Sequence, residues 1–157
     1  MKLLVGGLYD LANGKAGKEL AEAYGDGLPP RVSIVVKRLL NSVDAEIKVV
    51  EPERIKLLSQ YATKNEEKNT YDLPDMKTKK GKEFIGLWNE LMGTETEIKY
   101  EPIDLDKFVD AMDNIGKIIK GSVLDLIELL NKTYEFEKEA PKKEESASEK
   151  AEEKTEH

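Results

Sequence analysis

The chain has 157 residues, of which 39% are hydrophobic and 36% are charged, and its formal net charge is −7. It contains no cysteine, which excludes disulfides, thiolate nucleophiles and cysteine-based metal sites. Its only histidine is the last residue, His157, which excludes a Ser–His–Asp or Cys–His catalytic arrangement.

Hydropathy and charge also restrict the partners. No stretch of about 18 apolar residues occurs, so we expect no membrane span. Residues 1–7 are too short an apolar run for a signal peptide, and we therefore expect a cytoplasmic protein. The acidic body lacks the clustered Lys and Arg that duplex DNA or an anionic membrane requires. We expect neither as a partner, whereas a basic protein surface is compatible with this charge.

The N-terminal part of the chain divides into short pieces. Residues 2–5 are an apolar run that predicts an edge strand or a first helical turn. Residues 8–12 have helical spacing and predict a short helix that stops near residues 13–14. Residues 20–24 predict a second helix, which ends at the glycine-rich turn 25–27.

The longest periodic pattern is an apolar stripe whose steps alternate between four and three residues, as in the a/d seam of a heptad repeat. The stripe consists of Val36, Leu40, Val43, Ile47, Val50, Arg54, Leu57 and Tyr61. It predicts a long helix over residues 30–63, with Pro30 at the first helical position. We assign these side chains to packing or to an interface. We favour packing within the chain, which is compatible with dimerisation at one end, over an intermolecular coiled coil.

Two residues complicate this helix. Pro52 removes a backbone hydrogen bond and costs about 3 kcal/mol in a helix interior, yet the heptad phase continues across it. We therefore expect a kinked helix or two nearly collinear helices. Arg54 is the one charged member of the stripe: it either pairs with a buried acid, or packs its stem and extends its head into water. A third alternative is that the kink rotates Arg54 out of the stripe.

Residues 63–81 are polar and predict a long exposed connection with a short extended piece at 70–73. Lysines form a small basic patch at positions 77, 79, 80 and 82. Residues 84–92 predict an amphipathic helix ended by Gly93. Its tryptophan, Trp88, is interpreted as a packing residue; the alternative is a nucleic-acid stacking platform with the neighbouring phenylalanine and lysines.

The C-terminal third begins with a half-buried strand predicted over residues 95–103, for which residues 2–5 are the best partner. Asp104 or Asp106 is expected to cap a helix whose apolar face extends over 108–119. A last helix is predicted over 123–134.

The fold class predicted from these elements is mainly α, with a minor β element. We expect one helical domain over residues 1–136 and a disordered, Lys/Glu-rich acidic tail over 137–157. A solubilising tail is the favoured interpretation, and binding to a basic partner is the alternative.

Two patterns could in principle carry chemistry. Gly6-Gly7 and the segment 14–18 hint at a phosphate loop, but no complete Walker pattern occurs and we interpret them as turns. Asp106, Asp110 and Asp113 share one helix face. They would suit a divalent cation or a carboxylate active site, but the spacing is not that of a calcium loop and we interpret them as a solvated face. We therefore expect no cofactor, no metal and no catalytic residues.

Three segments, taken in order, carry a resemblance that covers about two-thirds of the chain, from Leu28 to about Tyr134. They are LPPRVSIVVKRLL, EPERIKLLSQYATKNEE and KEFIGLWNELMGTETEIKYEPIDLDKF. This order resembles a small uncharacterised family of tailed-phage proteins from phages of Gram-positive bacteria. The resemblance implies a phage or prophage gene expressed in a bacterial cytoplasm. The family has no established activity, so no functional residue transfers, and this chain departs from it at Pro52 and in the tail.

These observations favour a non-enzymatic phage accessory protein that acts through protein–protein contacts, in virion assembly or as a minor structural component. It would work in the host cytoplasm or in the virion. One alternative is a small acidic regulator that inhibits a host enzyme or defence factor. Another is a metal-dependent enzyme that uses the acids of residues 104–113.

Overall fold

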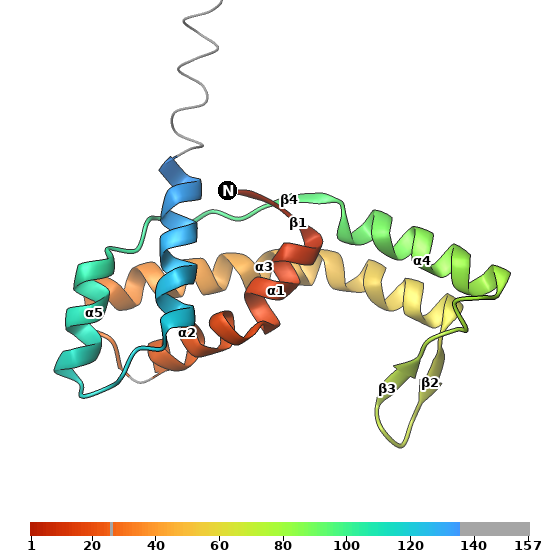
Figure 1. Ribbon diagram of the computed structural model, residues 1–157, viewed down its shortest axis with the longest axis horizontal. Coiled ribbons are helices and arrows are strands. Elements are labelled where there is room, and N and C mark those ends of the chain that lie inside the picture. Colours follow the sequence, from red (N-terminus) through yellow and green to blue (C-terminus); the bar gives the residue numbers. More distant parts are fainter. Residues whose placement is uncertain (26, 136–157) are drawn as a thin grey trace, which may run out of the picture. The chain divides into compact units, whose positions relative to one another are not determined.

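A computed structural model describes residues 1–25 and 27–135. The elements are β1 (Lys2–Leu4), α1 (Val5–Asn13), α2 (Lys15–Gly25), α3 (Pro30–Tyr61), β2 (Thr63–Asn65), β3 (Thr70–Asp72), α4 (Lys79–Met92), β4 (Glu95–Glu97) and α5 (Leu105–Asn114). A further helix, called here the C-terminal helix, covers residues 121–135 and is drawn in blue in Figure 1. The prediction of a mainly helical fold is therefore confirmed. The tail predicted over 137–157 lies outside the described residues.

The long helix predicted from the stripe is confirmed, and α3 continues through Pro52 as one helix. It begins at Pro30, as predicted, and ends two residues before the predicted boundary because Thr63 starts β2. Pro52 is exposed, as is Lys48 one turn earlier. The proline leaves the Lys48 carbonyl without its helical donor, on a side of α3 where both residues are exposed.

The chain forms two compact units. Unit 1 contains Met1, Lys15–Leu39 and the chain from Lys99 onward, whereas unit 2 contains Lys2–Gly14 and Leu40–Ile98. Helix α3 thus contributes its first part to unit 1 and its remainder to unit 2. The single domain expected over residues 1–136 stays a prediction.

Unit 1 has its core among α2, the start of α3, α5 and the C-terminal helix. Its most completely buried side chains are Leu20, Val36, Leu39, Ile103, Phe108 and Ile127. Asp104 is the cap of α5, since its Oδ1 accepts a 3.1 Å hydrogen bond from the Lys107 backbone N–H. Of the two acids that the sequence proposed for this role, the first is therefore the one used.

The segment before α5 follows the C-terminal helix instead of continuing as a strand. The Asn131 side chain donates to the Ile103 carbonyl at 2.8 Å and accepts from its N–H at 3.0 Å. The Tyr100 hydroxyl donates to the Leu130 carbonyl. The strand predicted over 95–103 was too long: β4 ends at Glu97, because Glu97 lies opposite Lys2, the first residue of β1, and the partner strand extends no further.

Unit 2 contains two small antiparallel sheets. β1 pairs with β4, with Lys2 opposite Glu97 and Leu4 opposite Glu95, so the predicted partner is confirmed. β2 and β3 form a hairpin inside the segment 63–81 that the sequence presented as an exposed connection. A left-handed residue in its turn, Asn69 with a φ of 50°, allows the chain to reverse there.

Helix α4 begins five residues before its predicted start at residue 84. The Thr78 side chain caps it by accepting a 3.0 Å hydrogen bond from the Gly81 N–H. The capping threonine adds a first turn that contains Lys79, Lys80 and Lys82, so three of the four lysines of the predicted basic patch lie on the helix.

Candidate functional site

The eight stripe residues all lie on the inward side of α3. Val36, Val43 and Leu57 are buried, and the other five are half-buried, so none of the eight is exposed. Val36 belongs to unit 1, whereas Leu40 and the later members belong to unit 2. The heptad spacing thus identified the core-facing side of a helix that supplies both units.

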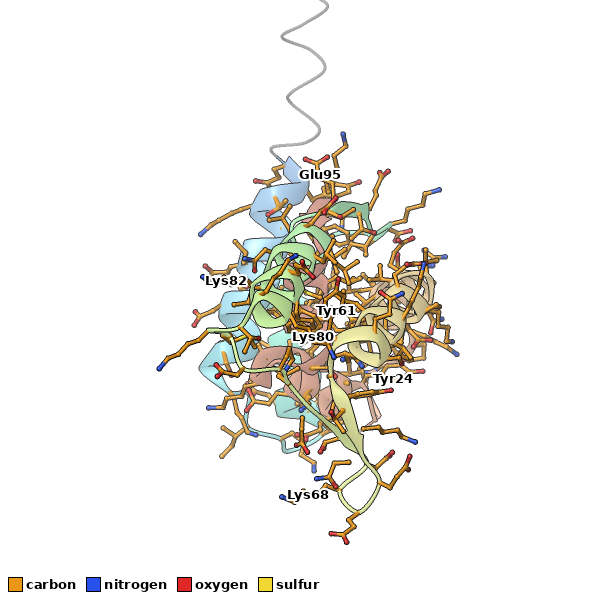
Figure 2. All side chains as sticks on the ribbon, turned by 90° about the vertical axis from the view of Figure 1, so that its right-hand side faces the viewer. Tyr24, Tyr61, Lys68, Lys80, Lys82 and Glu95 are labelled. Carbon is orange, nitrogen blue, oxygen red and sulfur yellow. The ribbon has the colours of Figure 1, made fainter. Side chains whose placement is uncertain are left out.

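Trp88 packs against the core of unit 2. That core contains Leu57, Leu58 and Phe84, and the half-buried Tyr61 and Trp88 lie against it. The Phe84 ring centroid lies 5.6 Å from that of Trp88 and 6.1 Å from that of Tyr61. Figure 2 labels Tyr61 between the ribbons of α3 and α4. The aromatic side chains therefore hold these two helices together.

Arg54 pairs with an acid on its own helix. Its guanidinium donates to the two Glu51 carboxylate oxygens, from Nε at 2.8 Å and from Nη2 at 2.6 Å. It also lies over the Tyr9 ring, 5.8 Å from the centroid. Both charged side chains are 31% exposed, so the pair is half-buried and the head of Arg54 does not extend freely into water.

The Tyr9 hydroxyl completes this cluster by donating to Glu51 Oε2 at 2.6 Å. Burial, followed by the bond to the Glu51 carboxylate, raises the pKa of Tyr9 to about 12. The Arg54 hydrogen bonds lower the pKa of Glu51. At neutral pH the tyrosine keeps its proton and the carboxylate stays ionised, so the cluster connects α1 to α3 and offers no general base.

A groove of about 330 Å³ lies between α3 and α4 in unit 2. The two helices run side by side in opposite directions there (Figure 1). Its lining residues are Glu53, Lys56, Leu57 and Gln60 from α3, with Leu87, Glu90, Leu91 and Thr94 from α4 and the residues just after it. The α3 residues have the spacing i, i+3, i+4, i+7, and the α4 residues Leu87, Glu90 and Leu91 have the spacing i, i+3, i+4; each is one stripe of a helix surface. The groove is therefore walled by two matching helical ridges.

The floor of this groove is apolar. Leu57 is buried, Leu91 is half-buried and Leu87 is 41% exposed. The Leu57 and Leu91 side chains also belong to the core of unit 2 or pack against it. The floor is therefore held in place by the same packing that joins the two helices.

The rim of the groove is polar and holds two glutamates and one lysine. Glu53 and Lys56 form a 3.4 Å ion pair in which both side chains are more than 60% exposed. Such a pair contributes little to folding stability, so these groups remain available to a partner. The Thr94 hydroxyl donates to the backbone carbonyl of Glu90 at 3.0 Å, and not to its carboxylate.

The glycines that hinted at a phosphate loop lie within helices or at a helix end instead. Gly6 and Gly7 lie within α1, and Gly17 is buried within α2. Gly14 ends α1, with its N–H donating to the Asp10 carbonyl at 2.8 Å. These positions do not form one loop.

The acids of α5 do not converge. Asp106, Asp110 and Asp113 are all exposed. In the part of the chain that the structure describes, no group of three or more His, Cys, Asp or Glu side chains could hold a metal ion.

The sequence also showed no sign of the role of Glu19, a buried residue of unit 1. Its carboxylate accepts a hydrogen bond from the Ser122 hydroxyl and lies 3.1 Å from Lys120 Nζ. The Ser122 bond, and then Lys120, lower its pKa despite burial. Both partners lie at the start of the C-terminal helix, where a carboxylate also complements the helix dipole. A partner 103 residues away leaves no local signal in the sequence.

Comparisons with known proteins add no relative. No family model matches the chain, and no curated protein or solved structure is significantly similar to it. Among the described residues, no helix has the length and apolar character needed to cross a membrane.

Proposed function

We propose that this chain is a non-enzymatic accessory protein that acts through protein–protein contacts, and that the groove between α3 and α4 is its contact surface. The observation that carries the proposal is an apolar floor with an exposed leucine, Leu87, enclosed by a charged rim. An apolar centre inside a polar rim is the usual anatomy of a protein interface.

The energetic argument concerns the exposed part of the floor. Apolar surface contributes about 25 cal/mol for each Å² removed from water, so a partner that covers Leu87 and Leu91 gains hydrophobic energy. Leu57 already lies in the core, and the floor therefore needs little rearrangement before a partner binds. A pre-formed surface reduces the ordering cost of association.

The resemblance to tailed-phage proteins supplies the biological context of this proposal. In that context the chain takes part in virion assembly or is a minor structural component, in the host cytoplasm or in the virion. The net charge of −7 favours one alternative, a small acidic regulator that inhibits a host enzyme or defence factor. Neighbouring head or tail genes would support the assembly role, whereas an early-gene cluster would support the inhibitor.

The experiment compares two substitutions on the same helix. Leu87 lines the groove, whereas Ile85 does not; their exposed fractions, 41% and 39%, are nearly equal. Affinity purification from cells that express the native gene should recover the same major protein with the wild-type chain and with Ile85→Asp. We expect Leu87→Asp to lose it. Recovery that is unchanged by Leu87→Asp, in protein whose circular dichroism is unaltered, would contradict the proposal.

A further inference from the structure

We infer that the occupant of the groove is an amphipathic helix of a partner protein, with leucine-like residues on one face and lysine or arginine beside them. This inference rests on the proposed function, because it names the class of partner that the same groove takes.

The lining of the groove selects among the known modes of peptide recognition. No sheet edge lines it, so an added β-strand has no backbone to pair with. None of the eight lining residues is aromatic or arginine, which disfavours a polyproline segment and a phosphopeptide respectively. The mode that remains is a helix laid between two helices.

The helical ridges on both walls suit such an occupant. A side chain entering a space bordered by residues at i, i+3, i+4 and i+7 meets the same pattern that packs helices within bundles. The lining from Glu53 to Gln60 covers two turns of α3, and that from Leu87 to Leu91 covers the last turn of α4, with Thr94 just beyond its end. A helix of two or three turns would therefore contact the whole groove.

The charge of the rim indicates which charge the bound helix should carry. Glu53 and Glu90 lie on opposite walls, and Lys56 is already paired with Glu53. The rim therefore carries a net charge of −1, on a chain whose total is −7. Cationic residues on the flanks of an incoming helix would meet a carboxylate on either side, which sets orientation and association rate more than affinity.

The test uses three synthetic peptides of about 20 residues, a length at which isolated helices form in water. The first is an alanine-based helix with leucines at i, i+3, i+4 and i+7 and lysines beside them. The second replaces the lysines with glutamates. The third keeps the lysines but has a proline at its centre, which breaks the helix. Binding to the full chain is followed by fluorescence anisotropy of the labelled peptide.

We expect the Leu/Lys helix to bind at least about tenfold more tightly than either other peptide, and Leu87→Asp to remove its advantage over the proline-containing peptide, which carries the same lysines. Ile85→Asp should leave it intact. Equal binding of the helix-breaking peptide would overturn the inference, as would equal losses from Leu87→Asp and Ile85→Asp.

A charge reversal distinguishes the effect of the rim carboxylates from the effect of the net charge of the chain. The double variant Glu53→Lys/Glu90→Lys should favour the Leu/Glu helix, whereas Glu66→Lys/Glu67→Lys in the hairpin turn, with the same change in net charge, should not. The same preference in both double variants would overturn the inference, because it would reflect net charge alone.

The two proposals fail in different ways. If Leu87→Asp releases the native partner but the helical peptides show no preference, the contact surface stands and the helical occupant is wrong. If the native partner is retained by Leu87→Asp, both are wrong.

Discussion

The Tyr9 hydroxyl donates a 2.6 Å hydrogen bond to the carboxylate of Glu51, a residue 42 positions further along the chain. This bond joins α1 to α3 within unit 2 and meets the Arg54 guanidinium at the same carboxylate. The one charged member of the apolar stripe is thereby neutralised where it is half-buried, which explains how an arginine fits an otherwise apolar pattern.

Tyr9→Phe is expected to reduce the free energy of unfolding by about 1.5–3 kcal/mol, the range for a hydrogen bond to a charged group. Urea denaturation of wild type and variant measures the difference. A Tyr9→Phe protein as stable as wild type would show that Arg54 alone satisfies Glu51.

The Tyr9–Glu51 hydrogen bond predicts that folding stability depends on pH in the alkaline range. The folded-state pKa of Tyr9 is raised from 10.0 to about 12, so the folded protein holds this proton more tightly than the unfolded chain. The stability that this adds is fully present below pH 10 and is lost as the pH rises towards 12. The gap between wild type and Tyr9→Phe should therefore shrink over that interval; a gap that is constant with pH would contradict this account.

Alanine substitutions at two glycines of α4 should change the stability of the protein in opposite directions. A Cβ on Gly81 would lie 2.1 Å from the Asp75 carbonyl oxygen, whereas one on Gly86 would meet nothing within 4 Å. Gly81→Ala should therefore destabilise the protein by about 1–3 kcal/mol through overpacking. Gly86→Ala should stabilise it by about 1 kcal/mol through helix propensity. Fluorescence of Trp88, the one tryptophan of the chain, reports the unfolding of unit 2 in both variants.

Pro52→Ala tests whether α3 needs its proline. Because the helix continues through this exposed position, alanine should restore one backbone hydrogen bond and stabilise the protein by up to about 3 kcal/mol. Thermal unfolding followed by circular dichroism measures the change. A loss of stability would instead mean that the packing of α3 depends on the local geometry that proline imposes.

The Glu19→Gln variant tests whether the stability of unit 1 depends on pH in the acidic range. The folded-state pKa of Glu19 is lowered below its ordinary 4.5, so its contribution is present above that value and is lost as the pH falls through the folded pKa. The variant should be less stable than wild type at neutral pH and equal to it in strong acid. Denaturant melts at several pH values measure this, and a difference that persists unchanged in strong acid would refute the electrostatic role.

Local patterns in the sequence were enough to predict most of the helical fold. Heptad spacing located the inward face of α3, and the turn signals near residues 13–14 and 25–27 ended α1 and α2 close to their observed boundaries. The alternation around Ile98 identified the partner of β1 but not the end of β4. The end of β4 is set by its partner strand, since Glu97 lies opposite Lys2, the first residue of β1.

The groove could be predicted only in part. Leu57 and Leu91 were visible as apolar helix positions, but their common groove depends on how α3 packs against α4, and spacing within one helix does not carry that information. The Tyr9–Glu51 and Glu19–Ser122 contacts were missed for the same reason, since each joins residues more than 40 positions apart.

Site-specific photo-cross-linking in cells that express the native gene shows directly which protein contacts the groove. A photoreactive phenylalanine analogue replaces Leu87 in the groove or, as the matched control, Ile85 on the same helix. We expect one dominant cross-linked protein from position 87 and little or none from position 85. Equal cross-linking from both positions, or none from position 87, would contradict the assignment of this groove as the contact surface.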